Sequence, residues 1–428
     1  MSDPTSPGHP FPPGALNVNG FSFFNAVSFQ IMLGAPVVLY AKSLGASSLV
    51  LGFIASLTPL LTIMQLVAAR YLHRTGYRKF VLAGWGTRTF FTLCIALLPI
   101  VPGLSTSTRL TLLAVALFAF SFVRGLASGA WLPWMSSLVP ENVRGRFLSR
   151  DQAFMQMGSL VAMLVSGWVM AGQVEAGEYA SVFGIAMICG VASLLFIHRI
   201  PEVDSPEALR RSSVRVPWAA MMKYAPFARL LIFTTNYMLI MGGLSVFTVE
   251  YLVVKQKFTE ATILLLSAWA FVGALAGLAI SGPRLDVTGS KPWLQRALVM
   301  QAGVIGMWFC LSAGVLPGWA GLIAALNLLG GVAGAVFGVA NTRIIMSSVP
   351  VMGRNHFFAL FTVITSLGLG GAPLAWGAVL DTLGTYEVVT GGFSLNRYTI
   401  YFAALVVLAA GNLLLARRLH EGSLPDVS

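Results

Sequence analysis

The stretch ARYLHRTGYRK, residues 69–79, joins two long apolar runs and holds four Lys and Arg residues. A second stretch, GPRLDVTGSK, residues 282–291, repeats its spacing in the other half of the 428-residue chain. Gly76 and Gly289 hold equivalent places in the two stretches. This repeated spacing predicts a chain built from two copies of one unit.

The composition excludes a soluble protein. The chain is 57% hydrophobic and only 10% charged, whereas about 25% of the residues in soluble domains are charged. No soluble core could bury that much apolar surface, so we expect the lipid bilayer to be the solvent. The three cysteines, Cys94, Cys189 and Cys310, lie far apart inside apolar runs, so no metal or disulfide spacing is present. We expect no metal site and no cofactor.

Apolar runs of roughly 20 residues follow one another along the chain, and each is long enough to cross about 30 Å of hydrocarbon. Most of the links between them are short, so we expect successive helices to be antiparallel neighbours. The sequence predicts an all-α polytopic membrane protein with twelve transmembrane helices. The expected spans are 20–41, 47–69, 80–101, 109–136, 151–172, 179–199, 227–253, 259–282, 293–315, 319–347, 356–380 and 397–417.

One longer polar link, residues 200–226, divides the expected spans into two sets. We expect six-helix bundles at 17–199 and 227–418, with a disordered tail at 1–16 and a short tail at 419–428. A second repeat supports this division, because a pair of glycines recurs at a constant offset. These pairs are Gly158 with Gly368 and Gly167 with Gly377.

The positive charge lies mostly on one side of the expected bundle. Most of the 27 Lys and Arg residues flank that side, so we expect it to be cytoplasmic, together with both termini and the 200–226 linker. The net charge of +12 does not predict nucleic-acid binding, because the cations sit in short loops between spans. We expect a monomer in a bacterial inner membrane, with the lipid bilayer and a small-molecule substrate as its partners.

The two basic stretches resemble the signature loop of the major facilitator superfamily, Gly-three residues-Asp-Arg-x-Gly-x-Arg-Arg. That loop follows the second helix of each six-helix half. Each copy departs from the pattern: Ala69 replaces the glycine and His73 the aspartate, while Val287 stands where an arginine is usual. The resemblance implies two pseudo-symmetric six-helix bundles that rock around a midplane site lined by helices 1, 4, 7 and 10.

The basic loops are candidates for a conformational gate. Their cations could meet carboxylates or helix ends in one state and lose those contacts in the other, which would bias a two-state equilibrium. The alternative is that these cations only fix the topology. The expected gate residues are Arg74, Gly76, Arg78, Lys79, Asp286, Gly289 and Lys291.

Arg124 is the most informative single residue. It lies near the middle of the fourth span, where a charge is costly and normally faces a protein interior or a wet cavity. Ser121, Ser128 and Trp131 share its helix face at 100° per residue. We expect this face to bind substrate, and the alternative is a structural arginine bonded to nearby carbonyls. Arg88, in the third span, is expected to be structural.

The other expected binding residues come from spans 1, 7 and 10. They are Asn25, Asn236, Phe247 and Asn341. Glu250 shares a face of span 7 with Asn236 and Phe247 and is the expected proton-coupling residue, because a shielded carboxyl could carry a proton. The alternative is an interface carboxylate exposed at the outer rim.

These patterns favour transport over other functions. No phosphate-binding GxxxxGK[ST] motif is present, and no nucleophile–base pair or metal cluster lies at mid-depth, so we expect no enzyme. We expect a secondary transporter of a small polar or anionic organic solute, such as a sugar or carboxylate, with a proton or cation as the coupling ion. The alternatives are a drug or metabolite efflux antiporter and a membrane receptor that binds its ligand without moving it.

The expected topology can be tested by thiol labelling. With the native cysteines replaced by serine, single cysteines at Thr5, Ser212 and Leu424 should resist an impermeant maleimide in intact cells and react after permeabilisation. Ready labelling at position 212 in intact cells would reverse the orientation.

Overall fold

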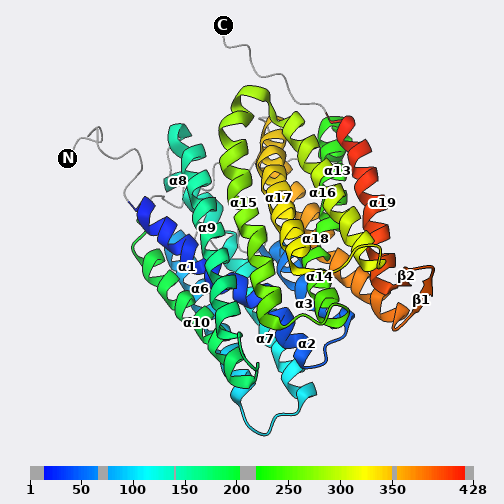
Figure 1. Cartoon of the computed structure of the whole chain (residues 1–428). Coiled ribbons are helices and arrows are strands. Elements are labelled where there is room, and N and C mark those ends of the chain that lie inside the picture. The colour runs from blue at the N-terminus through cyan, green and yellow to red at the C-terminus, as the bar shows by residue number, and fades with distance from the viewer. Residues whose placement is uncertain (1–13, 66–75, 139–140, 203–217, 349–353, 420–428) are drawn as a thin grey trace.

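The computed structural model describes residues 14–65, 76–138, 141–202, 218–348 and 354–419. In this part of the chain, eleven helices are long and apolar enough to cross a membrane, and a shorter apolar helix covers Ser48–Met64. The twelve expected spans are consistent with these helices, although the end of the second lies outside the described residues. The helices run side by side as one bundle (Figure 1).

In the described residues before 200, the spans comprise eight α-helices and two short 3-10 turns. They are α1 (Ala15–Leu33), α2 (Ala35–Ser43), α3 (Ser48–Leu61), η1 (Thr62–Met64), α6 (Tyr77–Leu97), η2 (Leu98–Ile100), α7 (Thr106–Ser128), α8 (Trp131–Leu138), α9 (Glu141–Val169) and α10 (Ala176–His198).

The spans after residue 218 follow the same plan and add a short hairpin. Their elements are α12 (Trp218–Lys223), α13 (Ala225–Met241), α14 (Leu244–Val254), α15 (Glu260–Thr288), α16 (Ser290–Ser312), α17 (Ala320–Ser348), α18 (Arg354–Leu383), β1 (Glu387–Thr390), β2 (Phe393–Asn396) and α19 (Arg397–Arg417).

The outside of the bundle is apolar. Trp168 is 79% exposed, and Val407 and Leu414 are also strongly exposed. Large apolar side chains on so much of the surface would be costly in water, whereas hydrocarbon accepts them. This surface agrees with the bilayer as the solvent.

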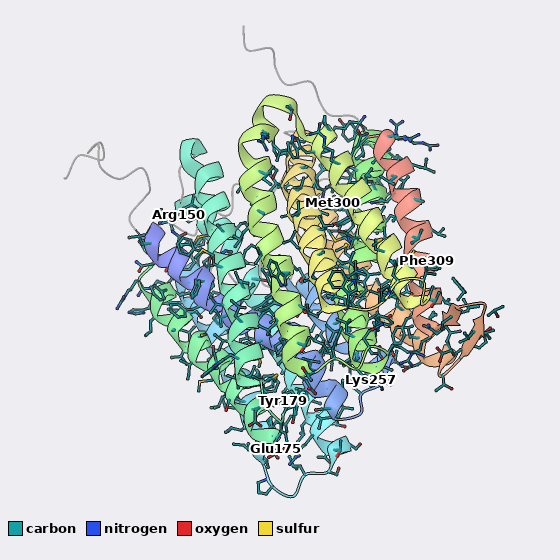
Figure 2. The ribbon with its side chains drawn as sticks, viewed as in Figure 1. Arg150, Glu175, Tyr179, Lys257, Met300 and Phe309 are labelled. Carbon is teal, nitrogen blue, oxygen red and sulfur yellow. The ribbon has the colours of Figure 1, made fainter. Side chains whose placement is uncertain are left out.

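The β1–β2 hairpin was not expected from the sequence. Its strands pair antiparallel and turn through Gly391 and Gly392, whose φ angles of 56° and 85° suit the two-residue turns of tight hairpins. We call the end of the bundle that carries it the hairpin end. Glu175 and Lys257 lie toward this end, and Arg150 lies toward the opposite end (Figure 2).

Two of the membrane helices are broken near their middles. The first span is interrupted at Gly34, which has extended backbone and is followed by Pro36 in the first turn of α2. The seventh span is interrupted at Gly242 and Gly243, between α13 and α14. At Gly34 the backbone is extended, which glycine tolerates, and Pro36 cannot donate a backbone hydrogen bond. At Gly242 and Gly243 the backbone angles stay in the helical region, so the interruption there is milder.

The sequence repeat is also a structural repeat. Gly76 caps the start of α6 with φ 75° and ψ 160°, and Gly289 caps the start of α16 with φ 80° and ψ 169°. An L-residue is strained at these angles. The equivalent glycines of the two basic loops therefore serve the same purpose, which is to turn the chain into the next membrane helix.

The repeated glycines of α9 and α18 make equivalent close contacts. Gly158 faces the backbone of Phe23 in α1, and Gly368 faces Thr235 in α13. In the second pair, each glycine contacts the other half of the chain. Gly167 faces Leu265 in α15, and its counterpart Gly377 faces Ser48 at the start of α3. Small residues at these places let the helix backbones approach closely.

Candidate functional site

A cavity of about 420 Å³ lies where the two broken helices meet. Gly34 and Ala35 line it from the break in the first span, and Met241 and Leu244 line it from the break in the seventh. Helices α9, α15, α16 and α17 complete its walls. Irregular backbone at membrane depth is tolerated where it lines a cavity, and broken helices often mark the substrate sites of transporters.

The lining of the cavity combines amides and hydroxyls with aromatic rings, and it contains no charged side chain. The polar lining residues are Gln30, Ser245, Thr248, Ser267, Gln301 and Asn327, and the aromatic ones are Phe29, Phe271 and Trp308. Such a surface suits a small solute that offers both hydrogen-bonding groups and a ring or carbon skeleton.

Gln301 in α16 is the polar residue most available to a ligand. Its Oε1 atom is buried and has no hydrogen-bond partner among the described residues. Asn327 in α17 is partly occupied, because its amide nitrogen donates to the Leu266 carbonyl at 3.1 Å. A buried acceptor without a hydrogen bond costs free energy. A ligand that donates a hydrogen bond to Gln301 would remove this cost, which would favour its binding.

The expected binding residues of spans 1 and 4 lie beside this cavity rather than in its lining. The Arg124 guanidinium carbon lies 4.5 Å from the centroid of the Phe29 ring, and Phe29 lines the cavity. Asn25 accepts a hydrogen bond from the Trp85 indole at 3.0 Å. Trp131, the first residue of α8, lies 6.4 Å from Trp85, centroid to centroid.

Ser128 closes α7 and is bonded within the protein. Its hydroxyl donates to the Gly125 carbonyl at 3.0 Å and accepts from the Gln65 amide at 3.0 Å. The hydroxyl therefore has an acceptor within α7 and a donor in Gln65, which follows η1. These bonds leave it little capacity for a ligand.

The expected residues of spans 7 and 10 pack against other helices. Asn236 donates to the Leu408 carbonyl in α19 at 3.2 Å, and Asn341 accepts from Thr234 at 3.2 Å. The Phe247 ring is fully buried and lies against Tyr401. The structure therefore does not bring these three residues to the cavity described above.

The break in the seventh span explains part of this difference. A helical wheel assumes a continuous turn of 100° per residue, but Asn236 lies before Gly242 and Phe247 lies after it. Each of the two residues packs against its own neighbour, which is the Leu408 carbonyl for Asn236 and the Tyr401 ring for Phe247. Sequence reasoning also missed Gln301 and Ser267, because it expected no cavity wall from the eighth and ninth spans.

Glu250 is the centre of a buried ion cluster at the hairpin end. The residue is only 1% exposed. Its carboxylate accepts hydrogen bonds from Lys42 at 3.0 Å and from Arg397 at 3.2 Å. The Ser48 hydroxyl donates to the same carboxylate at 2.8 Å. We call Lys42, Ser48, Glu250 and Arg397 the latch, because they tie α2 and α3 to α14 and α19.

Asp381 adds a second connection at the same end. Its carboxylate, in α18, accepts hydrogen bonds from the backbone N–H groups of Ser48 at 2.9 Å and Leu49 at 3.0 Å. These are the first residues of α3, so the negative charge meets the positive end of that helix dipole. The contact also satisfies backbone donors that no helix can satisfy internally.

The basic loops at the opposite end are described only in part. The backbone N–H of Arg78 donates to Glu202 at 3.2 Å, and Lys79 is exposed. Lys291 donates to the Leu419 carbonyl at 2.7 Å. Arg74 and the Asp286 side chain lie outside the described residues. A role of these loops in conformational gating stays a prediction.

A lipid-facing bundle around a cavity at two broken helices is the architecture of a membrane transporter. The Major Facilitator Superfamily model matches residues 18–298, which is well over half of the chain. The chain belongs to the major facilitator superfamily. It is an integral membrane protein, and its function is the secondary transport of a small solute.

Solved structures share this fold at low sequence identity. A D-xylose–proton symporter has a TM-score of 0.75 and 14% identity, with 96% of this chain and 98% of that chain covered. The inward-open xylose transporter XylE from E. coli has a TM-score of 0.67, 15% identity and 96% of each chain covered. A mutant of the nucleoside transporter NupG has a TM-score of 0.70 and 13% identity, with 95% and 99% covered. No curated protein sequence matches the chain.

The latch predicts a specific change in accessibility. Glu250→Gln removes the charge that holds Lys42 and Arg397, so the hairpin end should open more often. A cysteine placed at Ala46, which is 2% exposed, should then react several times faster with a maleimide than it does beside the native latch.

A second ion pair at the same end provides the control. Lys255 and Glu387 lie 2.8 Å apart, but both side chains are substantially exposed. Glu387→Gln should leave the labelling rate at position 46 unchanged, since exposed pairs contribute little. Equal rates in the two variants would show that Glu250 does not hold this end closed.

Proposed function

We propose that the chain carries a small polar organic solute through the 420 Å³ cavity by alternating access. The two moving bodies are the six-helix bundles at 17–199 and 227–418, joined by the linker 200–226. The observation that carries this proposal is the position of the cavity, since both helix breaks and residues from both bundles line it. A solute bound there touches both moving bodies and can follow their motion.

The orientation follows from the charge distribution. The positive-inside rule places the basic loops, both termini and the linker in the cytoplasm, and therefore places the hairpin end outside. The latch and Asp381 would then tie the helices together on the outer side. We propose a bacterial inner membrane as the location and a monomer as the working unit.

Two features of the cavity support a ring-bearing, hydroxyl-rich or amide-bearing solute. The amides of Gln30, Gln301 and Asn327 can pair with hydroxyl groups, and the Trp308 and Phe271 rings can stack on a flat or apolar face. The solved relatives include proteins described as a nucleoside transporter and a D-xylose–proton symporter. Both descriptions name solutes that combine rings with hydroxyl groups.

Gln301 gives the direct test of this cavity as the binding site. Gln301→Leu keeps the size of the side chain but removes the free acceptor, so the apparent affinity for the solute should fall about tenfold. Counterflow in proteoliposomes, screened with radiolabelled sugars and nucleosides, measures this affinity.

Asn412 in α19 is a matched control for this variant. Its amide is also buried and without a partner among the described residues, but it does not line the cavity. Asn412→Leu should retain the native affinity. A Gln301→Leu protein that exchanges solute with native affinity would exclude this cavity as the binding site, and a wild type without any counterflow would contradict the transport proposal.

We further propose that coupling, where a proton drives transport, runs through Glu250. A proton on its carboxyl would cancel the charge that attracts Lys42 and Arg397, so proton binding would favour opening of the outer side. Loss of the proton would restore the latch and close it. Proton binding and formation of the latch would thus exclude each other, as coupling requires.

Accumulation measurements separate coupling from transport. Glu250→Gln mimics the protonated carboxyl permanently, so it should abolish accumulation driven by a proton gradient while solute exchange continues. The readout is uptake into proteoliposomes with and without an imposed pH gradient. Accumulation that still responds to this gradient in the variant would assign coupling to another group.

A further inference from the structure

We propose that Arg88 and Arg124 form a subsite for the carboxylate group of an organic solute, beside the cavity. The observation behind this proposal is a fully buried charge without a counterion. Arg88 is 1% exposed, and none of its three guanidinium nitrogens has a hydrogen-bond partner among the described residues. Buried charges in proteins are normally paired, because an isolated one is strongly disfavoured.

The surroundings of Arg88 hold it in place without neutralising it. Its guanidinium carbon lies 5.4 Å from the centroid of the Trp85 ring and 5.3 Å from that of Phe120. The Trp85 ring is fixed in turn by its hydrogen bond to Asn25. Contacts with ring faces attract a cation more weakly than a carboxylate does, so the guanidinium is oriented but remains free to bind an anion.

A second arginine, Arg124, adds to the positive charge around Arg88 and so favours the binding of an anion. Arg88 lies over the Phe120 ring in α7, and Arg124 lies one helical turn further along the same helix. The described residues give neither arginine an ion pair; the described pairs are Lys42–Glu250, Arg397–Glu250 and Lys255–Glu387. Two neighbouring guanidiniums without a carboxylate create a local excess of positive charge inside the bundle.

The sequence shows that the surrounding helices cannot supply the missing charge. Residues 4–140 contain no Asp and no Glu, and they include all of α1, α6 and α7. In α9, Asp151 is already bonded to Ser22 near the opposite end. In the later spans, Glu250 is held by the latch and Asp381 by the start of α3. A ligand is therefore the natural source of the counterion.

The position of the pair relative to the cavity indicates the kind of ligand. Arg124 stacks on Phe29, and the ring of Phe29 is part of the cavity wall. A solute whose body lies in the cavity could extend an anionic group past Phe29 to the two arginines. Aromatic rings around the subsite favour a planar carboxylate over a phosphate, which needs more polar donors, and the guanidinium fork matches a carboxylate geometrically.

This inference rests on the proposed function only in treating the anion as part of the transported solute. It gives that solute a chemical class, a small organic monocarboxylate whose body carries a ring or hydroxyl groups. The neutral amides of the cavity would bind the body, and the arginine pair would bind the charged end.

The test compares benzoate with benzamide, which have the same shape and differ in charge. Thermal unfolding of the full-length protein in nanodiscs measures binding. Benzoate should raise the melting temperature of the wild type and benzamide should raise it less. In the absence of ligand, the Arg88→Met protein should have a higher melting temperature than the wild type, because the substitution removes an uncompensated buried charge. The affinity of this variant for benzoate should fall at least about tenfold.

Arg296 provides the matched control. It also lies over an indole ring, 5.1 Å from the centroid of Trp293, but it is exposed. Arg296→Met should change neither the melting temperature nor the preference for benzoate. Arg124→Met is the second variant at the subsite and should also lose the preference for benzoate, which keeps the test decisive if Arg88→Met does not fold.

Each outcome bears on the proposal. A lower melting temperature in a folded Arg88→Met protein would show that Arg88 is structural and would overturn the subsite. An unchanged benzoate preference in Arg124→Met, or equal responses of the wild type to benzoate and benzamide, would overturn it as well. A stronger response to inorganic phosphate than to benzoate would reassign the subsite to phosphate and overturn the carboxylate assignment.

Counterflow separates this inference from the proposed function. Binding of benzoate without exchange of any solute would contradict transport through the cavity and leave the anion subsite standing. The opposite result has two parts: Arg88→Met exchanges neutral solutes with native affinity, and the wild type shows no preference for benzoate. This result would support transport and contradict the subsite.

Discussion

The structure depends on one constraint, which is that backbone polar groups in hydrocarbon must be paired within the protein. Continuous helices meet this constraint alone, so a membrane helix can be interrupted only where protein or a cavity receives the freed groups. Among the described residues, helices are interrupted at Gly34 and at Gly242–Gly243, and both of these interruptions border the same cavity. The cavity and these breaks therefore explain each other.

Charge inside the bundle is handled in two contrasting ways. At the hairpin end, the Glu250 carboxylate receives two cations and a hydroxyl, so the charges of the latch are paired with one another. Removing one partner from such a buried cluster is costly because the others are left uncompensated. Arg88 has no such partner among the described residues. A paired cluster such as the latch stabilises one conformation, whereas an unpaired charge such as that of Arg88 creates affinity for a ligand.

The fold was largely predictable from the sequence, and the site was predictable only in part. Apolar runs and the spacing around Gly76 and Gly289 predicted the spans and the repeat, because length and backbone conformation are local properties. The partners of Glu250 were not predictable, since Lys42 and Arg397 are distant in the chain and only the folded bundle brings them together. The helical wheel placed Asn236 and Phe247 on one face, but they lie on either side of the break at Gly242 and neither lines the cavity. The sequence alone favoured a structural role for Arg88, and the absence of acids from residues 4–140 is the signal behind the proposed subsite.

The two proposed bundles share a fold but differ in what they offer a solute. The first contributes the arginine pair behind Phe29, and the second contributes the Gln301 and Asn327 amides. A ligand shifts a conformational equilibrium only through different affinities for the two states. In the first bundle a neutral solute would meet only the Gln30 amide and apolar contacts, so it would gain less from the approach of that bundle. A solute with a polar body and an anionic end contacts both bundles at once, so its binding energy depends directly on their separation. The division of charge between the bundles thus provides a physical route from solute recognition to the rocking motion.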